Sequence, residues 1–369
     1  MTHRPLDLDG HAVTVSDPER RLCGDTGPTK LEIMAYYIKV APRLLLFLRG
    51  RAITTVFGPD DSTQVFRFAR TAPPGCAGRF PTYRLTCFAK PQPQSYLTVP
   101  NSDTLEALVE YGCVSFHPWS SLAATALHPS QMVFNLDPEA IAFREVRNAA
   151  LLVRDLLSAC GLTSWAKTSG GHGIHVLVPL DAGRAFDDAH LVADMIVRRA
   201  IRREPTLFSR DPRRARRRGR ILIDTSRNAC GGTLIAPYSV ATSGLVSAPV
   251  EWDELERPMY PEDFDMARVM ARESVALEDQ AAFGTAEQSI EPLLGLRRVR
   301  RAPNRDRAPL LHGERTGRFD DTPGVLIDEA RWLRAKSRRL RDEAEVAHVE
   351  SADVQQRARK LLDERRDVL

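Results

Sequence analysis

Residues 133–137 carry an apolar β-strand pattern, Val-Phe-Asn-Leu-Asp, that places two polar side chains on one face. Because side chains alternate between the two faces of a strand, Asn135 and Asp137 point the same way. Pro138 follows, and residues 143–160 then show the spacing of an amphipathic helix. Strands and helices alternate along the chain without the strict order of a doubly wound sheet, which favours an α+β, or mixed α/β, fold class.

The remaining elements are predicted from apolar periodicity, helix caps and breaker residues. Helices are expected at about 30–48, 102–111 and 187–204, strands at 12–16, 174–179 and 220–224, and short strands between 51 and 99. Residues 296–325 are rich in Arg, Pro and Gly, and the charged sequence after them predicts two helices. We therefore expect a core domain at 1–290, followed at 291–369 by an Arg-rich linker and a helical C-terminal extension.

Composition narrows the class of protein and its compartment. The 369 residues are 43% hydrophobic with a net charge of +4, so the chain can bury a core and is not a polycation overall. Its six cysteines form no CxxC pair, which argues against a zinc site or a disulfide framework and fits a reducing cytoplasm. The N-terminus lacks the apolar core of a signal peptide, and no nearby apolar run is long enough to span a bilayer. We expect a cytoplasmic protein without a membrane partner.

Three segments carry polar residues suited to phosphate chemistry. The first is the strand with Asn135 and Asp137, and the second is an apolar strand that ends in Asp224. The third runs from Lys167 to His175 as Lys-Thr-Ser-Gly-Gly-His-Gly-Ile-His. Carboxylates are hard ligands for divalent cations, and a glycine-rich backbone with nearby Ser and His can bind triphosphate oxygens. In metal-dependent nucleotidyltransferases such a strand usually carries two carboxylates, whereas the first of the pair here is an amide.

Each segment also has a purely structural interpretation. A glycine-rich turn before a strand is often only a turn, and an Asp at a strand end is often a cap. His175 lies within an apolar strand, which also fits a hydrogen-bonded core histidine. The presence of all three segments in this order favours the functional interpretation.

Basic residues are clustered rather than spread evenly. Dense runs of one sign repel each other and favour a polyanionic partner such as nucleic acid, although a solvated surface is the alternative. The arginines concerned lie on a predicted helix, before the strand at 220–224 and after residue 296: Arg198, Arg199, Arg202 and Arg203; Arg213, Arg214, Arg216, Arg217, Arg218 and Arg220; Arg297, Arg298, Arg300, Arg301, Arg305 and Arg307.

Several longer motifs occur in a fixed order between residues 10 and 270. They are Ser16-Asp-Pro-Glu-Arg-Arg-Leu-Cys-Gly-Asp-Thr-Gly-Pro-Thr-Lys30, Phe116-His-Pro-Trp119, Val133-Phe-Asn-Leu-Asp-Pro138, Lys167-Thr-Ser-Gly-Gly-His-Gly-Ile-His175, Ile223-Asp-Thr-Ser-Arg-Asn228 and Ala236-Pro-Tyr-Ser-Val240. Together they resemble the polymerase domain of bacterial DNA ligase D, in the archaeo-eukaryotic primase superfamily. The resemblance implies a primase-polymerase core with a central, mainly antiparallel sheet.

The resemblance also implies a function and its ligands. It implies a template-dependent polymerase that fills gaps at DNA double-strand breaks during non-homologous end joining, at the bacterial nucleoid. DNA ends with a 5′-phosphate and NTPs or dNTPs would be its ligands, and Ku and a DNA ligase are candidate partners. The metal cofactor would be Mn²⁺ or Mg²⁺.

Site residues follow from the resemblance by position. The metal triad falls on Asn135, Asp137 and Asp224. The nucleotide site falls on Lys167, Ser169, Gly170, Gly171, His172 and His175, and the pocket for the DNA 5′-phosphate on Asp17, Arg20 and Lys30.

The chain departs from the family at positions that would do the chemistry. Asn135 stands where the family has Asp, His172 where it usually has Lys, and Ala241 where Arg is common. A neutral amide is a poor bridge between two cations, and the other changes remove charge that would oppose a triphosphate. The 5′-phosphate pocket keeps Arg20 and Lys30, although an Asp replaces the usual Asn beside them.

The leading hypothesis is a DNA-end-binding nucleotidyltransferase of break repair whose activity is weakened by Asn135. The alternative is a catalytically inactive module of the same fold that holds DNA ends or recruits a partner such as Ku or a ligase. A third hypothesis is a nucleotide-binding regulator. Primer extension separates the first hypothesis from the other two.

Overall fold

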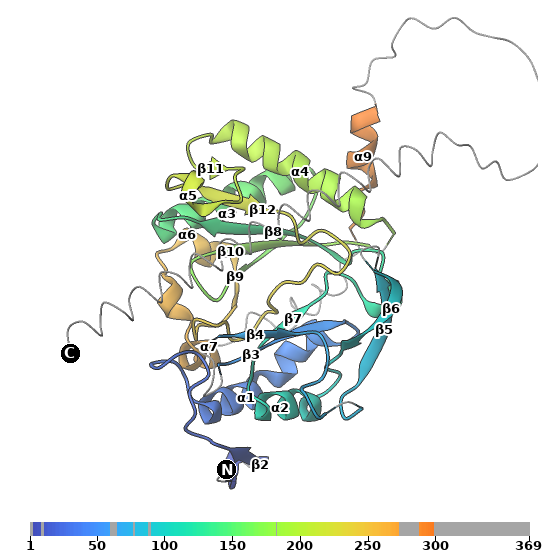
Figure 1. Ribbon diagram of the computed structural model, residues 1–369. Coiled ribbons are helices and arrows are strands. Elements are labelled where there is room, and N and C mark those ends of the chain that lie inside the picture. Colours follow the sequence, from blue (N-terminus) through green and yellow to red (C-terminus); the bar gives the residue numbers. More distant parts are fainter. Residues whose placement is uncertain are drawn as a thin grey trace, which may run out of the picture. The chain divides into compact units, whose positions relative to one another are not determined.

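The computed structural model describes residues 3–8, 11–59, 65–76, 78–87, 90–181, 183–272 and 288–298 (Figure 1). The chain divides into two compact units, Met1–Ala302 and Pro303–Leu369, and every described residue belongs to the first. Apart from the helix α9 (Glu291–Arg298), the predicted linker and helical C-terminal extension lie outside the described residues. The domain boundary at residue 290 stays a prediction. No described helix is both long and apolar enough to cross a membrane.

A six-stranded sheet carries most of the predicted site residues. Its strand order is β11-β12-β8-β10-β9-β13, and neighbouring strands are antiparallel except β11 and β12, which are parallel. The predicted α+β class with a mainly antiparallel sheet is therefore confirmed. The strands are β8 (Gln131–Pro138), β9 (Trp165–Thr168), β10 (Ile174–Pro179), β11 (Phe208–Ser209), β12 (Ile221–Asp224) and β13 (Pro249–Val250).

A five-stranded sheet lies below the first one in Figure 1. Its strand β3 pairs with β7 along its length, with β4 near one end and with β6 at the other, and β5 pairs with β6. A separate hairpin of β1 and β2 precedes it in the chain. The strands are β1 (His3–Leu8), β2 (His11–Ser16), β3 (Ile53–Phe57), β4 (Arg67–Ala69), β5 (Thr82–Cys87), β6 (Lys90–Leu97) and β7 (Cys113–Pro118).

Long helices pack on each sheet. The helices α3 (Phe143–Ser158) and α4 (Phe186–Arg203) contact each other and β8 of the six-stranded sheet. The helices α1 (Lys30–Leu48) and α2 (Ser102–Glu110) contact each other and β7 of the five-stranded sheet. Shorter elements are α5 (Arg214–Arg217), α6 (Trp252–Glu256), α7 (Met266–Ala271) and the 3₁₀ turns η1 (Ala123–Thr125) and η2 (Pro261–Phe264).

The start of α1 is fixed by a capping box. The Thr29 hydroxyl accepts a hydrogen bond from the Glu32 N–H, and the Glu32 carboxylate accepts one from the Thr29 N–H. Both bonds satisfy N–H groups that have no partner within the helix. The cap therefore sets Lys30 as the first helical residue, at the place where the sequence predicts the 5′-phosphate pocket.

Candidate functional site

The sheet register aligns four predicted site residues across four neighbouring strands. Asp224 of β12 lies opposite Asn135 of β8, Asn135 lies opposite His175 of β10, and His175 lies opposite Lys167 of β9. Residues directly opposite each other share a sheet face, with Cβ atoms about 4.5–5.5 Å apart. We call these four residues the cross-strand row. The three sequence segments predicted to converge therefore do meet.

The cross-strand row lies on the sheet face that points away from α3 and α4. Phe134 belongs to the main core, which those helices share, whereas Val133 belongs to a separate cluster with Leu177 and Leu234. Because strand side chains alternate, Asn135 shares the face of Val133. The polar residues of the row are thus kept apart from the largest apolar core.

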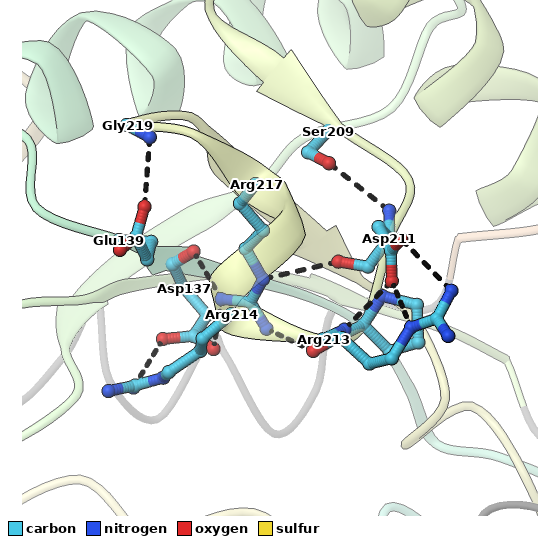
Figure 2. Close-up of polar contacts among 9 residues, drawn as sticks. Asp137, Glu139, Ser209, Asp211, Arg213, Arg214, Arg217 and Gly219 are labelled. Atoms are coloured by element: carbon cyan, nitrogen blue, oxygen red, sulfur yellow. Dashed lines mark hydrogen bonds and ion pairs between the residues drawn. The ribbon is translucent and has the colours of Figure 1, made fainter.

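Asp137 is paired with two arginines from the segment before β12 (Figure 2). Arg217 Nη1 lies 2.8 Å from Asp137 Oδ2, and Arg214 Nη2 lies 3.1 Å from Asp137 Oδ1. Arg217 is only 3% exposed, whereas Arg214 lies at the surface. Each carboxylate oxygen of Asp137 therefore faces a guanidinium group.

The segment between β11 and β12 is folded so that it holds Arg217 in place. Arg217 also donates to the main-chain oxygens of Asp211, at 3.2 Å, and of Pro212, at 2.8 Å. Gly219, with a φ of 72°, donates its N–H to Glu139 Oε2 at 2.8 Å (Figure 2). The end of β8 is thus tied twice to a segment 80 residues further along the chain.

A pair of divalent cations does not fit this set of side chains. Asn135 offers a neutral amide, and both oxygens of Asp137 are already paired with guanidinium groups. Asp224 accepts the Ser226 N–H through Oδ1 at 2.8 Å. Across the described part of the chain, no group of three or more His, Cys, Asp or Glu side chains is placed to hold a metal ion. Two fixed positive groups beside the predicted triad also repel a cation.

The glycine-rich loop between β9 and β10 is tightly packed. Ser169 closes it, because its hydroxyl accepts the Gly173 N–H at 3.1 Å and its N–H donates to the Gly173 oxygen at 3.0 Å. Gly170 has a φ of 76°, and a Cβ atom there would lie 2.4 Å from the Cβ of Ala241. Gly171 is half-buried and His172 is exposed. Among the hydrogen bonds between described residues, neither the Ser169 hydroxyl proton nor the His172 ring is used, so both are available to a ligand.

Lys167 and His175 form a buried pair at one end of the row. Lys167 Nζ lies 2.7 Å from His175 Nδ1, and the two residues are 1% and 3% exposed. Burial lowers the pKa of Lys167 well below its ordinary value. Burial, the nearby Lys167, and then His117 and Arg227 lower the pKa of His175 in the same way. At neutral pH the imidazole of His175 is therefore uncharged.

The five-stranded sheet reaches this buried pair through His117 of β7. Burial lowers the pKa of His117 to about 3, with contributions from Lys167 and Arg227. The ring of His117 is hydrogen-bonded through Nε2 to Ser115 Oγ at 2.9 Å. The imidazole rings of His117 and His175 are thus both held neutral at neutral pH.

The predicted 5′-phosphate pocket contains an internal ion pair. Lys30 is 3% exposed, and its Nζ lies 3.0 Å from Glu110 Oε2 and 2.8 Å from both oxygens of Ser16. Burial lowers the pKa of Lys30, and Glu110 opposes that shift. Arg20 and Asp17 both act electrostatically on Lys30. The structure thus brings the three predicted residues together, but with a carboxylate already bound to the lysine.

Sequence reasoning missed the side chains that neutralise the predicted site. The arginine run predicts DNA contact for Arg214 and Arg217, whereas both pair with Asp137 in the structure. The available signal was strand pairing: if β12 runs antiparallel to β8, the residues before β12 lie beside the end of β8. Nothing in the sequence around Glu110 shows that α2 ends beside Lys30.

Comparisons with known proteins show the family and the fold of this chain. Residues 29–279 match the family model described as LigD, primase-polymerase domain. The polymerase domain of Mycobacterium tuberculosis ligase D, solved in complex with DNA, superposes with a TM-score of 0.64 at 26% identity. The match covers 73% of this chain and 98% of that one.

Two curated relatives show the same similarity in sequence. The multifunctional non-homologous end joining protein LigD of Pseudomonas aeruginosa is 33% identical over 251 residues, which is 66% of this chain and 29% of that protein. The bifunctional non-homologous end joining protein LigD of Bacillus subtilis is 26% identical over 249 residues, or 66% of this chain and 39% of that protein. The chain thus corresponds to about a third of the length of these relatives.

Proposed function

Because this chain belongs to the family of LigD primase-polymerase domains, we propose that it binds broken DNA ends during non-homologous end joining and adds nucleotides to them only weakly. The names of its relatives support the repair process. The DNA bound to the similar M. tuberculosis domain supports the ligand. A location at the nucleoid, and contacts with Ku and a DNA ligase, belong to the same proposal.

One observation carries the weakness of nucleotide transfer. Asn135 supplies no charge, and Asp137 is paired with Arg214 and Arg217. Of the predicted triad, only Asp224 is a carboxylate that pairs with no arginine among the described ion pairs. Mn²⁺ or Mg²⁺ would therefore find a single unpaired carboxylate there. Stabilisation of developing charge is usually the largest contribution to catalysis, so its loss costs the most.

Nucleotide binding is the part of the family's function that the remaining residues favour. Ser169 supplies a hydroxyl and His175 a neutral imidazole, both able to donate to triphosphate oxygens. The exposed His172 lies in the same loop. We infer a triphosphate site of low affinity, since the fixed charges expected at positions 172 and 241 are absent.

Primer extension on gapped DNA with a 5′-phosphate tests the weak transfer. We expect little extension by this chain with Mn²⁺ or Mg²⁺, and a gain of about 100-fold in Asn135→Asp, which corresponds to about 2.7 kcal/mol. Adding Arg214→Ala should raise the rate further, because it frees one oxygen of Asp137. Arg213→Ala in the same background is the control, since Arg213 pairs with Asp211 instead. Fast Mg²⁺-dependent extension by the unmodified chain would contradict the proposal.

The second candidate function is a DNA-end-binding module without any catalysis. The pairing of Asp137 with two arginines favours this binding module. Even if position 135 regained its carboxylate, Asp137 would still be neutralised. The two candidates differ in one measurement. Complete absence of extension by the unmodified chain, with retained binding to 5′-phosphorylated ends in fluorescence anisotropy, would identify the binding module.

A further inference from the structure

We propose that Lys167 is a positioning residue that holds the imidazole of His175 as the tautomer with its proton on Nε2, ready to donate to phosphate oxygens. The part about phosphate rests on the proposed nucleotide site. The part about the tautomer rests only on the contacts of Lys167. The family resemblance implies that Lys167 binds the nucleotide, but its three hydrogen-bond partners within the protein occupy its ammonium group.

Strand pairing fixes the two side chains next to each other. Lys167 and His175 lie directly opposite on the antiparallel strands β9 and β10. Lys167 Nζ is 2.7 Å from His175 Nδ1, which is a short distance for a nitrogen donor and acceptor. Both residues are almost fully buried, so neither ring nor chain can turn to water instead.

Counting protons decides which atom donates. The Ser247 hydroxyl donates to the main-chain oxygen of Thr168 at 2.7 Å, so its proton is already used. Lys167 Nζ, at 2.6 Å from Ser247 Oγ, must therefore donate to that oxygen. The Thr168 oxygen, at 3.5 Å, is a second acceptor for the same ammonium.

His175 Nδ1 is then the third acceptor around Lys167 Nζ. Burial lowers the pKa of Lys167, but three acceptors around Nζ favour its ammonium form. An ammonium group has three N–H donors and no acceptor, so the three neighbours match its capacity. If Nδ1 accepts, the single ring proton of a neutral imidazole lies on Nε2. Burial and the nearby charge of Lys167 lower the pKa of His175, which keeps the ring neutral. A neutral ring carries one proton, so its tautomer decides which nitrogen can donate.

The second ring nitrogen of His175, Nε2, is the one left for a ligand. His175 lies between Lys167 and Asn135 in the cross-strand row, and Lys167 occupies Nδ1. Among the hydrogen bonds described for this chain, His175 Nε2 has no protein partner. A neutral imidazole with a fixed Nε2–H is a directed donor, whereas the other tautomer would present a lone pair and repel a phosphate oxygen.

Nitrogen NMR of the whole chain tests the tautomer directly. Long-range ¹H–¹⁵N correlation spectra distinguish a protonated Nδ1 from a protonated Nε2, and His175→Asn assigns the signals. We expect the Nε2–H tautomer in the unmodified chain and a mixture or a switch to Nδ1–H in Lys167→Met. Arg147→Met is the matched control, because it removes another buried cation that donates to the Leu255 oxygen. It should leave the tautomer unchanged.

Calorimetry with ATP gives an independent readout. We expect affinity for ATP to fall about tenfold in Lys167→Met, the size of one lost hydrogen bond to a charged group, and to stay within about twofold in Arg147→Met. A shift of tautomer without any ATP binding would support the positioning role and contradict the nucleotide site. An Nδ1–H ring in the unmodified chain, or an unchanged ring in folded Lys167→Met, would overturn the proposal. Because the unmodified chain already reports its tautomer, a Lys167→Met that fails to fold leaves that test in force.

Discussion

At the scale of single residues, the negative charge of the predicted metal triad is reduced. Asn135 replaces a carboxylate, and the charge of Asp137 is compensated by Arg214 and Arg217. The opposite end of the cross-strand row holds Lys167 and a neutral His175. Such a charge distribution favours anions over cations, in agreement with binding of nucleic acid or nucleotide phosphates rather than of metal ions.

In the proposed function, Glu110 would compete with a DNA 5′-phosphate for Lys30, so removing its charge should sharpen end recognition. Glu110→Gln leaves the Lys30 ammonium without its carboxylate partner. We expect the affinity ratio between 5′-phosphate and 5′-hydroxyl DNA to rise at least about fivefold, or about 1 kcal/mol. Fluorescence anisotropy with two recessed duplexes that differ only in that phosphate measures the ratio.

Asp103→Asn is the control for this experiment. Asp103 is exposed in the first turn of α2, so its loss changes the charge of the same helix without touching Lys30. An equal ratio in Glu110→Gln and Asp103→Asn would show that Lys30 does not meet the 5′-phosphate. Lys30→Ala should lower the ratio.

His117 makes stability depend on pH in a defined direction. Its pKa is about 3 in the fold and 6.5 in an ordinary histidine, because burial disfavours the charged ring. The unfolded chain therefore binds more protons below about pH 6.5, so stability that is fully present above this pH is lost as pH falls toward 3. One such proton changes the free energy of unfolding by about 1.4 kcal/mol per pH unit.

Urea unfolding between about pH 7 and about pH 5 measures this slope. We expect His117→Gln to show a shallower dependence on pH by up to one proton, since the amide cannot titrate. His172→Gln removes an exposed imidazole and serves as the control. Parallel stability curves for His117→Gln and the unmodified chain would contradict a half-buried ring that stays neutral in the fold.

At the scale of elements, periodicity and caps predicted the long segments well. The helix expected at 30–48 is α1 (Lys30–Leu48), and the strand expected at 174–179 is β10 (Ile174–Pro179). Two-residue strands such as β11 are too short to show alternation, and α5 is hidden within an arginine run. Long segments are readable because many residues repeat one period, whereas short elements are set by their neighbours.

The sequence predicted which segments form the site, but not which charged side chains pair with its residues. Three segments were expected to converge, and the register of β12, β8, β10 and β9 aligns them. The charge balance depends on which side chains approach from the segment before β12 and from α2. Those approaches are set by tertiary packing between distant parts of the chain, which no local pattern contains.

The glycine-rich loop should be sensitive to a single methyl group. Gly170→Ala combines a φ of 76° with a Cβ 2.4 Å from that of Ala241, so we expect a cost of about 2–4 kcal/mol in the free energy of unfolding. Gly75→Ala is the matched control, because its φ is 77° and nothing lies within 4 Å. It should cost only about 1 kcal/mol.

A double-mutant cycle separates crowding from backbone strain. Adding Ala241→Gly to Gly170→Ala removes the opposing methyl group and should recover the part of the cost that exceeds the control. Urea denaturation of the four chains gives the coupling energy. Strict additivity would mean that the loop moves away from Ala241 instead of packing on it.

At the scale of the whole molecule, net charge conceals local charge. The sum is only +4 over 369 residues. Positive charge is nevertheless concentrated locally, because exposed arginines are clustered near the end of α4 and in the segment after β11. They include Arg202, Arg203, Arg216 and Arg218. The chain matches about a third of the length of its relatives.

The salt dependence of DNA binding should report these arginines. Each phosphate contact adds about 0.9 to the slope of log affinity against log salt concentration, so Arg216→Ala with Arg218→Ala should reduce the slope by up to about 1.8. Arg144→Ala with Arg154→Ala on α3 removes the same charge from another element and is the control. Equal slopes in the two double variants would assign the effect to net charge alone.

The buried Arg217 makes the neutralisation of the Asp137 charge independent of the supply of metal ions. A bound metal ion can be diluted, chelated or exchanged for another, and its occupancy follows supply. A guanidinium that belongs to the chain is a counter-ion at fixed stoichiometry, anchored through Asp211 and Pro212 as well as through Asp137. The charge of Asp137 at the end of β8 is therefore compensated by the protein itself, and a shortage of manganese or magnesium leaves this compensation unchanged.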